Sequence, residues 1–292
     1  MTAYTLKNDR ITVRVAGTGG ELRSIQTADG TEYLWQPDPA FWVRQAPHLF
    51  PFVGRLMEGR YTWDGKSYEL GCHGFFRDQE LTLLDRTEDS VVLSITAAED
   101  TYPNYPRPFT VSLTYRLAES RVEIAFRVEN PGEKELTFGY GGHPGFFVPL
   151  EEGLAFEDYC LDFGAPCPAV QVMMSDACFL QGPDVPYPLE EGRYLPLRHE
   201  LFDRDAVILK DTTGTVTLRS RKGKRGVTVR YPGMPYLGIW HKPKAAAPYV
   251  CLEPWVSLPG RQDVIEDFGE KPDLVRLAPG EVYDNRWSIE VF

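Results

Sequence analysis

Apolar and polar residues alternate with a period of two from one end of this 292-residue chain to the other. Clear examples are residues 11–15, 111–115, 122–128 and 227–231. A period of two places every second side chain on the same face of a β-strand, so a strand can bury one face and leave the other in water. The pattern therefore predicts half-buried strands in sheets that are mainly antiparallel.

Turn residues separate these segments. Asp64-Gly65 lies between residues 60–63 and 66–70, and an Asp-Gly pair is typical of a two-residue hairpin turn. Ala118-Glu119-Ser120 joins two of the longest alternating segments in the same way. Both turns favour strands that pair with their neighbours along the chain.

Helical patterns are short, which argues against an α/β architecture. No helical stripe exceeds about three turns, and we expect short helices only at residues 198–204 and 263–268. Residues 160–201 are rich in Pro and Gly and are predicted to be a long irregular segment, either covering a site or serving as a surface connection. No linker divides the chain, and residues 286–292 have the pattern of a final strand. We expect an all-β chain with one large sandwich domain over residues 1–292.

The charge and cysteine content exclude several functions. A formal net charge of −11 repels nucleic acid and anionic membranes, whereas a small neutral substrate is compatible with it. The chain has no run of eighteen apolar residues and no signal-peptide core in its first ten residues, so we expect a cytoplasmic protein. Its five cysteines are odd in number and form no Cys-x-x-Cys pair, which indicates reduced thiols rather than disulfides or zinc ligands.

Two of the five histidines have similar surroundings. His73 lies within Gly-Cys-His-Gly-Phe-Phe and His143 within Gly-Gly-His-Pro-Gly-Phe-Phe. Glycines remove bulk around each imidazole and aromatic rings supply flat apolar walls, a combination that suits a sugar in a cleft. A buried structural histidine is the alternative at each position.

Glu253 is the acidic residue that stands out. It follows an apolar run and precedes Pro254, which favours an extended backbone. A carboxylate at the end of a buried strand needs either a structural partner or a function. A glycoside hydrolase usually needs two such carboxylates, and only Glu253 qualifies.

One carboxylate and one histidine are sufficient to interconvert the anomers of an aldose. A base removes the proton of the C1 hydroxyl, an acid protonates the ring oxygen, and the opened chain rotates before it closes again. At neutral pH a free carboxylate can accept a proton and an imidazolium can donate one. We expect no metal and no cofactor, because the histidines lack the spacings of a metal site.

Two arginines lie near the first histidine motif. Arg55 and Arg77 could each bind sugar hydroxyls or a phosphate, although Arg77 also has a possible salt-bridge partner in Asp78. The basic turn at residues 221–226 lies between two strand patterns and is predicted to be a solvated hairpin tip rather than a nucleic-acid site.

Taken together, the motifs of the chain resemble the aldose 1-epimerase (galactose mutarotase) superfamily, especially the branch encoded in bacterial lactose operons. The resemblance covers almost the whole chain and implies a supersandwich of two large, mainly antiparallel sheets. The motifs are Leu34-Trp35-Gln36, Phe41-Trp42, the run from Pro47 to Arg55, His73-Gly74-Phe75, the run from Gly141 to Phe146, the run from Tyr236 to Trp240, and Leu252-Glu253-Pro254-Trp255.

The resemblance also implies roles for the catalytic residues. Glu253 matches the base of the family and His143 the acid that protonates the ring oxygen. His73 looks like the histidine that orients the sugar, and Arg55 looks like the arginine that binds hydroxyls.

Further positions match the substrate pocket of the family. Its binding aspartate falls at Asp205, with Asp203 as the alternative, and Trp240 either stacks on the sugar or packs in the core. Arg77 matches an arginine of the branch that acts on hexose 6-phosphates, but Cys72 stands where a glutamine is common there.

The sequence therefore predicts a mutarotase acting on an aldohexose. A noncatalytic sugar-binding or sensing protein and a hexose-6-phosphate 1-epimerase are the alternatives. We expect a small sugar as the partner, and a monomer or a homodimer as the assembly.

Overall fold

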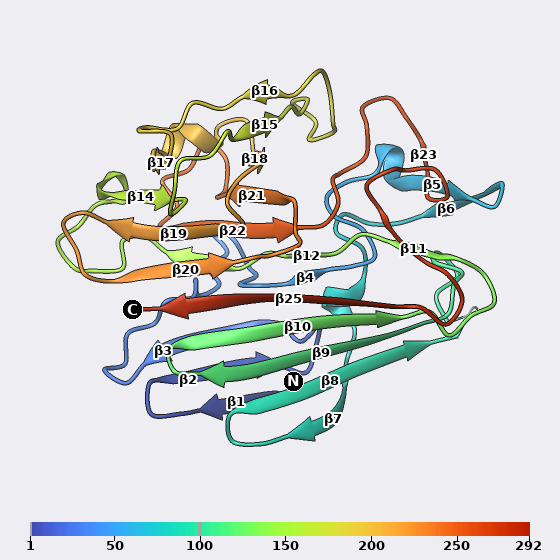
Figure 1. Cartoon of the computed structure of the whole chain (residues 1–292), viewed down its shortest axis with the longest axis horizontal. Coiled ribbons are helices and arrows are strands. Elements are labelled where there is room, and N and C mark those ends of the chain that lie inside the picture. Colours follow the sequence, from blue (N-terminus) through green and yellow to red (C-terminus); the bar gives the residue numbers. More distant parts are fainter. Residues whose placement is uncertain (1, 99–100) are drawn as a thin grey trace.

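A computed structural model describes residues 2–98 and 101–292, and these residues form strands joined by turns (Figure 1). The strands are β1 (Ala3–Lys7), β2 (Ile11–Ala16), β3 (Leu22–Thr27), β4 (His48–Leu49), β5 (Arg60–Trp63), β6 (Lys66–Glu69), β7 (Thr82–Arg86), β8 (Ser90–Ala97), β9 (Phe109–Ala118), β10 (Arg121–Glu129), β11 (Leu136–Phe138), β12 (Gly141–Gly142), β13 (Gly145–Phe147), β14 (Tyr159–Asp162), β15 (Val170–Val172), β16 (Val185–Pro186), β17 (Tyr194–Pro196), β18 (Val207–Lys210), β19 (Thr215–Ser220), β20 (Gly226–Arg230), β21 (Tyr236–Trp240), β22 (Tyr249–Trp255), β23 (Glu266–Asp267), β24 (Val275–Leu277) and β25 (Val282–Val291). The helices of this part of the chain are short 3-10 turns: η1 (Met57–Gly59), η2 (Phe76–Asp78), η3 (Phe156–Asp158) and η4 (His199–Phe202).

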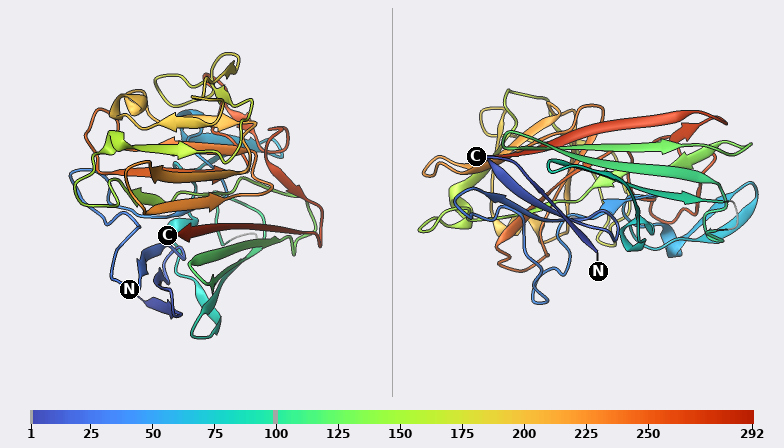
Figure 2. Two further views of the ribbon diagram at one scale, coloured as in Figure 1. Left: turned by 60° about the vertical axis from the view of Figure 1, so that its left-hand side comes forward. Right: turned by 90° about the horizontal axis from the view of Figure 1, so that it is seen from below.

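Two large sheets carry the architecture. The first has nine strands in the order β17-β14-β19-β20-β25-β10-β9-β8-β7, and the second has eight, in the order β16-β15-β18-β21-β22-β12-β4 with β13 beside β22. Their pairs are antiparallel, and Figure 2 shows the same strands after a turn about the vertical axis and from below. This is the predicted all-β supersandwich.

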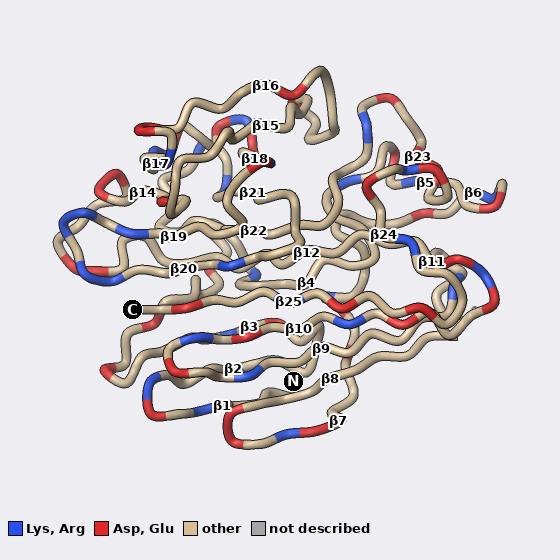
Figure 3. The backbone as a smooth tube through the Cα atoms, in the orientation of Figure 1, with Lys and Arg blue, Asp and Glu red and all other residues tan. Residues whose placement is uncertain are grey.

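The predicted alternation appears directly in the burial of the strands. In β10, Val122, Ile124, Phe126 and Val128 are at most 1% exposed, while the residues between them reach the surface. These side chains belong to a hydrophobic core that extends from Tyr4 to Val291. Basic and acidic residues are interspersed along the exposed strands and turns (Figure 3). That the chain is a single domain stays a prediction.

Both predicted hairpins are confirmed. β5 pairs with β6 across Asp64 and Gly65, whose positive φ values of 52° and 73° are those of a two-residue hairpin turn. β9 pairs with β10 from Ala118 and Arg121 outward. Residues 221–225 likewise join β19 to β20. The C-terminal strand is confirmed as β25, which lies between β20 and β10.

One prediction for an irregular region is wrong, and a second is right only in part. Residues 263–268 form no helix; they contain β23, which pairs in parallel with β5. Residues 160–201 contain most of β14 and all of β15, β16 and β17, which extend the two large sheets. At residues 198–204 the structure has the shorter helix η4. No helix of the described residues is long and apolar enough to span a membrane.

Candidate active site

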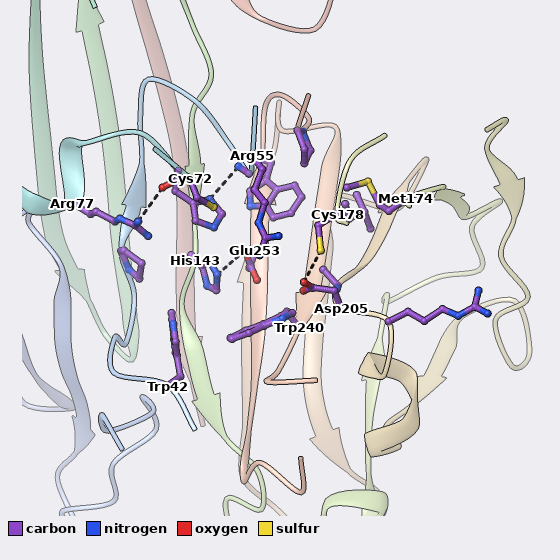
Figure 4. Close-up of a pocket in the computed structure, with 18 residues that line it drawn as sticks. Trp42, Arg55, Cys72, Arg77, His143, Met174, Cys178, Asp205, Trp240 and Glu253 are labelled. Carbon is purple, nitrogen blue, oxygen red and sulfur yellow. Dashed lines mark hydrogen bonds and ion pairs between the residues drawn. The ribbon is translucent and has the colours of Figure 1, made fainter. Parts of the chain in front are cut away.

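The predicted site residues gather around one cavity (Figure 4). Its lining includes Arg55, His73, Arg77, His143, Asp205, Trp240 and Glu253. Asp203 is not part of the lining, so the geometry favours Asp205 over its neighbour. Met174 and Cys178, from the connection between β15 and β16, close one side of the cavity. Part of the irregular segment therefore does cover the site.

Strand register brings the acid and the histidine together. Glu253 lies in the middle of the eight-stranded sheet on β22, where it pairs with Gly238 of β21. His143 follows β12, which also pairs with β22. The backbone N–H of His143 donates to Pro47 O at 3.1 Å, and Leu252 N–H donates to Pro144 O at 3.0 Å. These backbone hydrogen bonds fix the chain at His143 and next to Glu253, and so they fix the points from which the two side chains extend.

His143 and Glu253 form a close, buried pair. His143 Nε2 lies 3.2 Å from Glu253 Oε2, and the two side chains are 9% and 2% exposed. The ring of His73 stands edge-on to that of His143, with 5.6 Å between centroids. The three residues that the sequence singled out therefore meet at one place, with a carboxyl group facing an imidazole.

Burial disfavours the charged form of both partners. It lowers the pKa of His143 to about 3 and raises the pKa of Glu253 well above its usual value, an effect that Asp205 reinforces. A free carboxylate beside an imidazolium is therefore not the state that the pocket favours at neutral pH. We interpret the two groups as one titrating unit that shares a proton, which still supplies one donor and one acceptor.

His73 is held in one orientation. Its Nδ1 accepts a hydrogen bond from Gly54 N–H at 3.1 Å, and burial together with His143 keeps its pKa well below the usual range. The neutral ring therefore carries its proton on Nε2, where it can donate a hydrogen bond into the cavity. His73 and Gly74 both have positive φ values, 66° and 69°, and a Cβ on Gly74 would lie 2.3 Å from Phe50 O.

The polar residues of the cavity make few contacts with one another. Arg55 donates to Ala177 O at 3.4 Å, and Arg77 donates to Cys72 O at 2.9 Å. The predicted ion pair of Arg77 with Asp78 is long, at 3.7 Å, and Asp78 lies closer to Arg44, at 2.5 Å.

Asp205 keeps much of its capacity to accept hydrogen bonds. It accepts the S–H of Cys178 at 2.8 Å and the N–H of Ala206 at 2.9 Å. A carboxylate has about four acceptor sites, so Asp205 can still accept hydrogen bonds from a ligand in the cavity.

Aromatic rings form the wall next to His143. Trp42 stacks on the imidazole with centroids 4.8 Å apart, and Trp240 meets it edge-on at 5.7 Å. Trp240 thus lines the cavity and also packs against its neighbours, as in both alternatives drawn from the sequence.

Trp42, Arg204 and Trp255 also line the cavity and were not predicted as site residues. Trp42 and Trp255 lie in the motifs that carried the resemblance, and Arg204 lies between Asp203 and Asp205, the two aspartates that the sequence offered for the pocket.

One donor set could hold a metal ion. Single ligand atoms of His143, Cys251 and Glu253 lie within 4.8 Å of one another in the described part of the chain. A metal there would occupy the imidazole and the carboxyl that proton transfer needs.

The five cysteines are free thiols, as predicted.

Gly142→Ala is expected to destabilise the protein and slow any reaction at His143. A Cβ at position 142 would lie 2.5 Å from Trp287 Cζ2, and Trp287 is buried with its N–H bound to Tyr140 Oη. Such overpacking costs about 1–3 kcal/mol, measurable by urea unfolding. Gly71→Ala is the control, because no atom lies within 4 Å of its Cβ. Equal stability of the two variants would contradict this prediction.

Comparison with known proteins agrees with the fold and with the family resemblance of the sequence. Residues 2–290 match the family model for aldose 1-epimerase. The chain is 34% identical to the chromosomal LacX protein of Lactococcus lactis over 98% of both chains. A galactose mutarotase related enzyme from Lactobacillus acidophilus superposes with a TM-score of 0.94 at 33% identity, covering 100% of this chain and 97% of that one. A galactose mutarotase-like protein from Lactobacillus casei superposes at 0.93 with 29% identity over the full length of both.

The all-β supersandwich places the chain in the class of mutarotase-like proteins. The chain belongs to the aldose 1-epimerase family.

Proposed function

We propose that this protein interconverts the α and β anomers of an aldohexose. The observation that carries the proposal is the 3.2 Å contact between His143 Nε2 and Glu253 Oε2 at a cavity lined by hydrogen-bonding groups and tryptophans. Glu253 acts as the base at the C1 hydroxyl and His143 as the acid at the ring oxygen. His73, Arg55 and Asp205 hold the sugar, and Trp240 covers an apolar face of it. No cofactor takes part in these steps.

The buried pair fits a reaction in which one proton leaves and another arrives. Ring opening removes a proton from one sugar oxygen and adds one to another, so the net charge of the site need not change. A pair that shares one proton can do both, and a low dielectric favours such a charge-neutral exchange.

Polarimetry on freshly dissolved α-glucose and α-galactose tests the proposal. Catalysis should bring the optical rotation to its equilibrium value faster than buffer does, in proportion to the protein concentration. Exchange spectroscopy by NMR extends the test to other aldoses. A rate equal to that of buffer for every common aldose would refute it.

A hexose-6-phosphate epimerase is the second candidate, and the charge of the cavity favours it. In the described part of the chain, the cavity lining has three arginines, Arg55, Arg77 and Arg204, and two acidic residues, Asp205 and Glu253. Among the described residues, neither Arg55 nor Arg204 has an ion-pair partner within 4.0 Å. An anionic group on the sugar would supply one.

If phosphate is recognised, glucose 6-phosphate is expected to have a kcat/KM about tenfold above that of glucose. The exposed Arg204 should provide part of this gain, so Arg204→Gln should reduce it while leaving glucose turnover unchanged. Comparison of both substrates at low and high ionic strength is the measurement. Equal kcat/KM values would exclude this candidate.

A further inference from the structure

Trp255 is seated in a slot that two glycines leave open. It ends β22, is 4% exposed and pairs with Gly141 of β12. A Cβ on Gly141 would lie 2.5 Å from Trp255 Cδ1, and a Cβ on Gly238 of β21 would lie 2.7 Å from Cζ2. The indole therefore fits only because each neighbouring strand has a glycine at this position, and the surrounding backbone fixes the orientation of the ring.

The indole N–H of Trp255 has no hydrogen-bond partner in the described part of the chain, although it is fully buried. Leaving a buried donor unpaired is costly, so such groups in native proteins usually have a functional explanation. Trp255 lines the cavity, so a partner within the site would satisfy the donor.

Glu253 is the neighbour that can accept this hydrogen bond. The two residues are two positions apart on one strand, so their side chains point to the same face of the sheet. Burial and Asp205 raise the pKa of Glu253, whereas the indole N–H of Trp255 lowers it. Trp255 is thus the group that favours the ionised carboxylate.

Building on the proposed epimerase activity, we propose that Trp255 is a positioning residue. When Glu253 ionises, the indole N–H that is otherwise unpaired donates to its carboxylate and holds it ready to take the proton of the C1 hydroxyl. The short strands β12 and β21 carry glycines where this indole has to fit.

An isosteric replacement separates the donor from the packing. Benzothienylalanine at position 255 keeps the shape of the fused ring but has sulfur in place of the N–H. We expect kcat to fall about tenfold with KM within about twofold, and the apparent pKa assigned to Glu253 in the pH profile to rise by about one unit. Trp255→Phe should show the same pKa shift. Unchanged profiles in both variants would overturn the proposal.

A second measurement does not depend on turnover. The indole ¹H–¹⁵N resonance of Trp255, assigned by its loss in Trp255→Phe, should move as Glu253 titrates in the wild type and stay constant in Glu253→Gln. A resonance that ignores pH in the wild type would refute the role of Trp255. Wild-type protein without epimerase activity would instead refute the proposed function, and the titration would still decide on Trp255.

Discussion

Glu253→Gln is expected to slow anomer interconversion by about 10²- to 10⁴-fold, the contribution of a positioned general base. Glutamine preserves the size of the side chain but cannot accept the proton of the C1 hydroxyl. The His143 imidazole, 3.2 Å away, also loses the group with which it shares a proton. Polarimetry or NMR exchange gives the rate, and calorimetry with the same sugar gives the binding constant, which should change much less.

Asp203→Asn is the matched control for this experiment. It also removes one carboxylate near the cavity, but Asp203 is exposed and does not line it, so the rate should stay near that of the wild type. The pair of variants also separates an enzyme from a sensor: a protein that only binds sugar has no catalysed rate to lose. Full activity in Glu253→Gln would show that another group is the base.

The strands could be predicted from the sequence because their signal is local. Alternation in β10 and the Asp64-Gly65 turn each depend on neighbouring residues alone. Residues 263–268 were mispredicted because tertiary contacts decide their structure. There Glu266 is fully buried, binds Arg261 at 2.9 Å and pairs with β5, about two hundred residues away in the sequence.

For the site, the sequence predicted which residues come together but not their protonation states. Unusual residues in glycine-rich and aromatic motifs pointed to His73, His143 and Glu253, and the structure brings them together. Their protonation could not be predicted, because the pKa of Glu253 depends on burial by the surrounding sheet and on Asp205. Trp255 lies in the same motif as Glu253, but the packing of its indole depends on glycines in two other strands and could not be predicted from that motif.

The free energy of unfolding is expected to fall steeply as the pH is lowered from about 6.5 towards 4.5. Burial lowers the pKa of His48 and His143 to about 3 and that of His241 to about 4, and it keeps the pKa of His73 well below its usual value. Below pH 6.5 the unfolded chain binds a proton at each of these histidines and the folded chain does not. The unfolded state is therefore favoured as the pH falls, and these histidines cost no stability above pH 6.5.

Glu253 acts in the opposite direction. Because its pKa is raised, Glu253 binds a proton in the folded state at a higher pH than in the unfolded state. This proton offsets the proton that one of the four histidines binds only in the unfolded state. The remaining three protons correspond to about 4 kcal/mol per pH unit. Because domains of ordinary stability unfold with about 5–15 kcal/mol, we expect acid unfolding between about one and four pH units below pH 6.5. Urea unfolding at pH 7, 6 and 5 gives the slope directly.

His48 allows this explanation to be tested at a single site. Its ring lies between the hydroxyls of Tyr115 at 2.6 Å and Tyr140 at 3.2 Å and is 2% exposed. His48→Gln keeps hydrogen-bonding groups there but cannot be protonated, so the slope should fall by about 1.4 kcal/mol per pH unit. Tyr140→Phe weakens the same network without removing a group that titrates in this range, and should lower stability at every pH with the slope unchanged. Equal slopes in His48→Gln and the wild type would show that the acid sensitivity arises elsewhere.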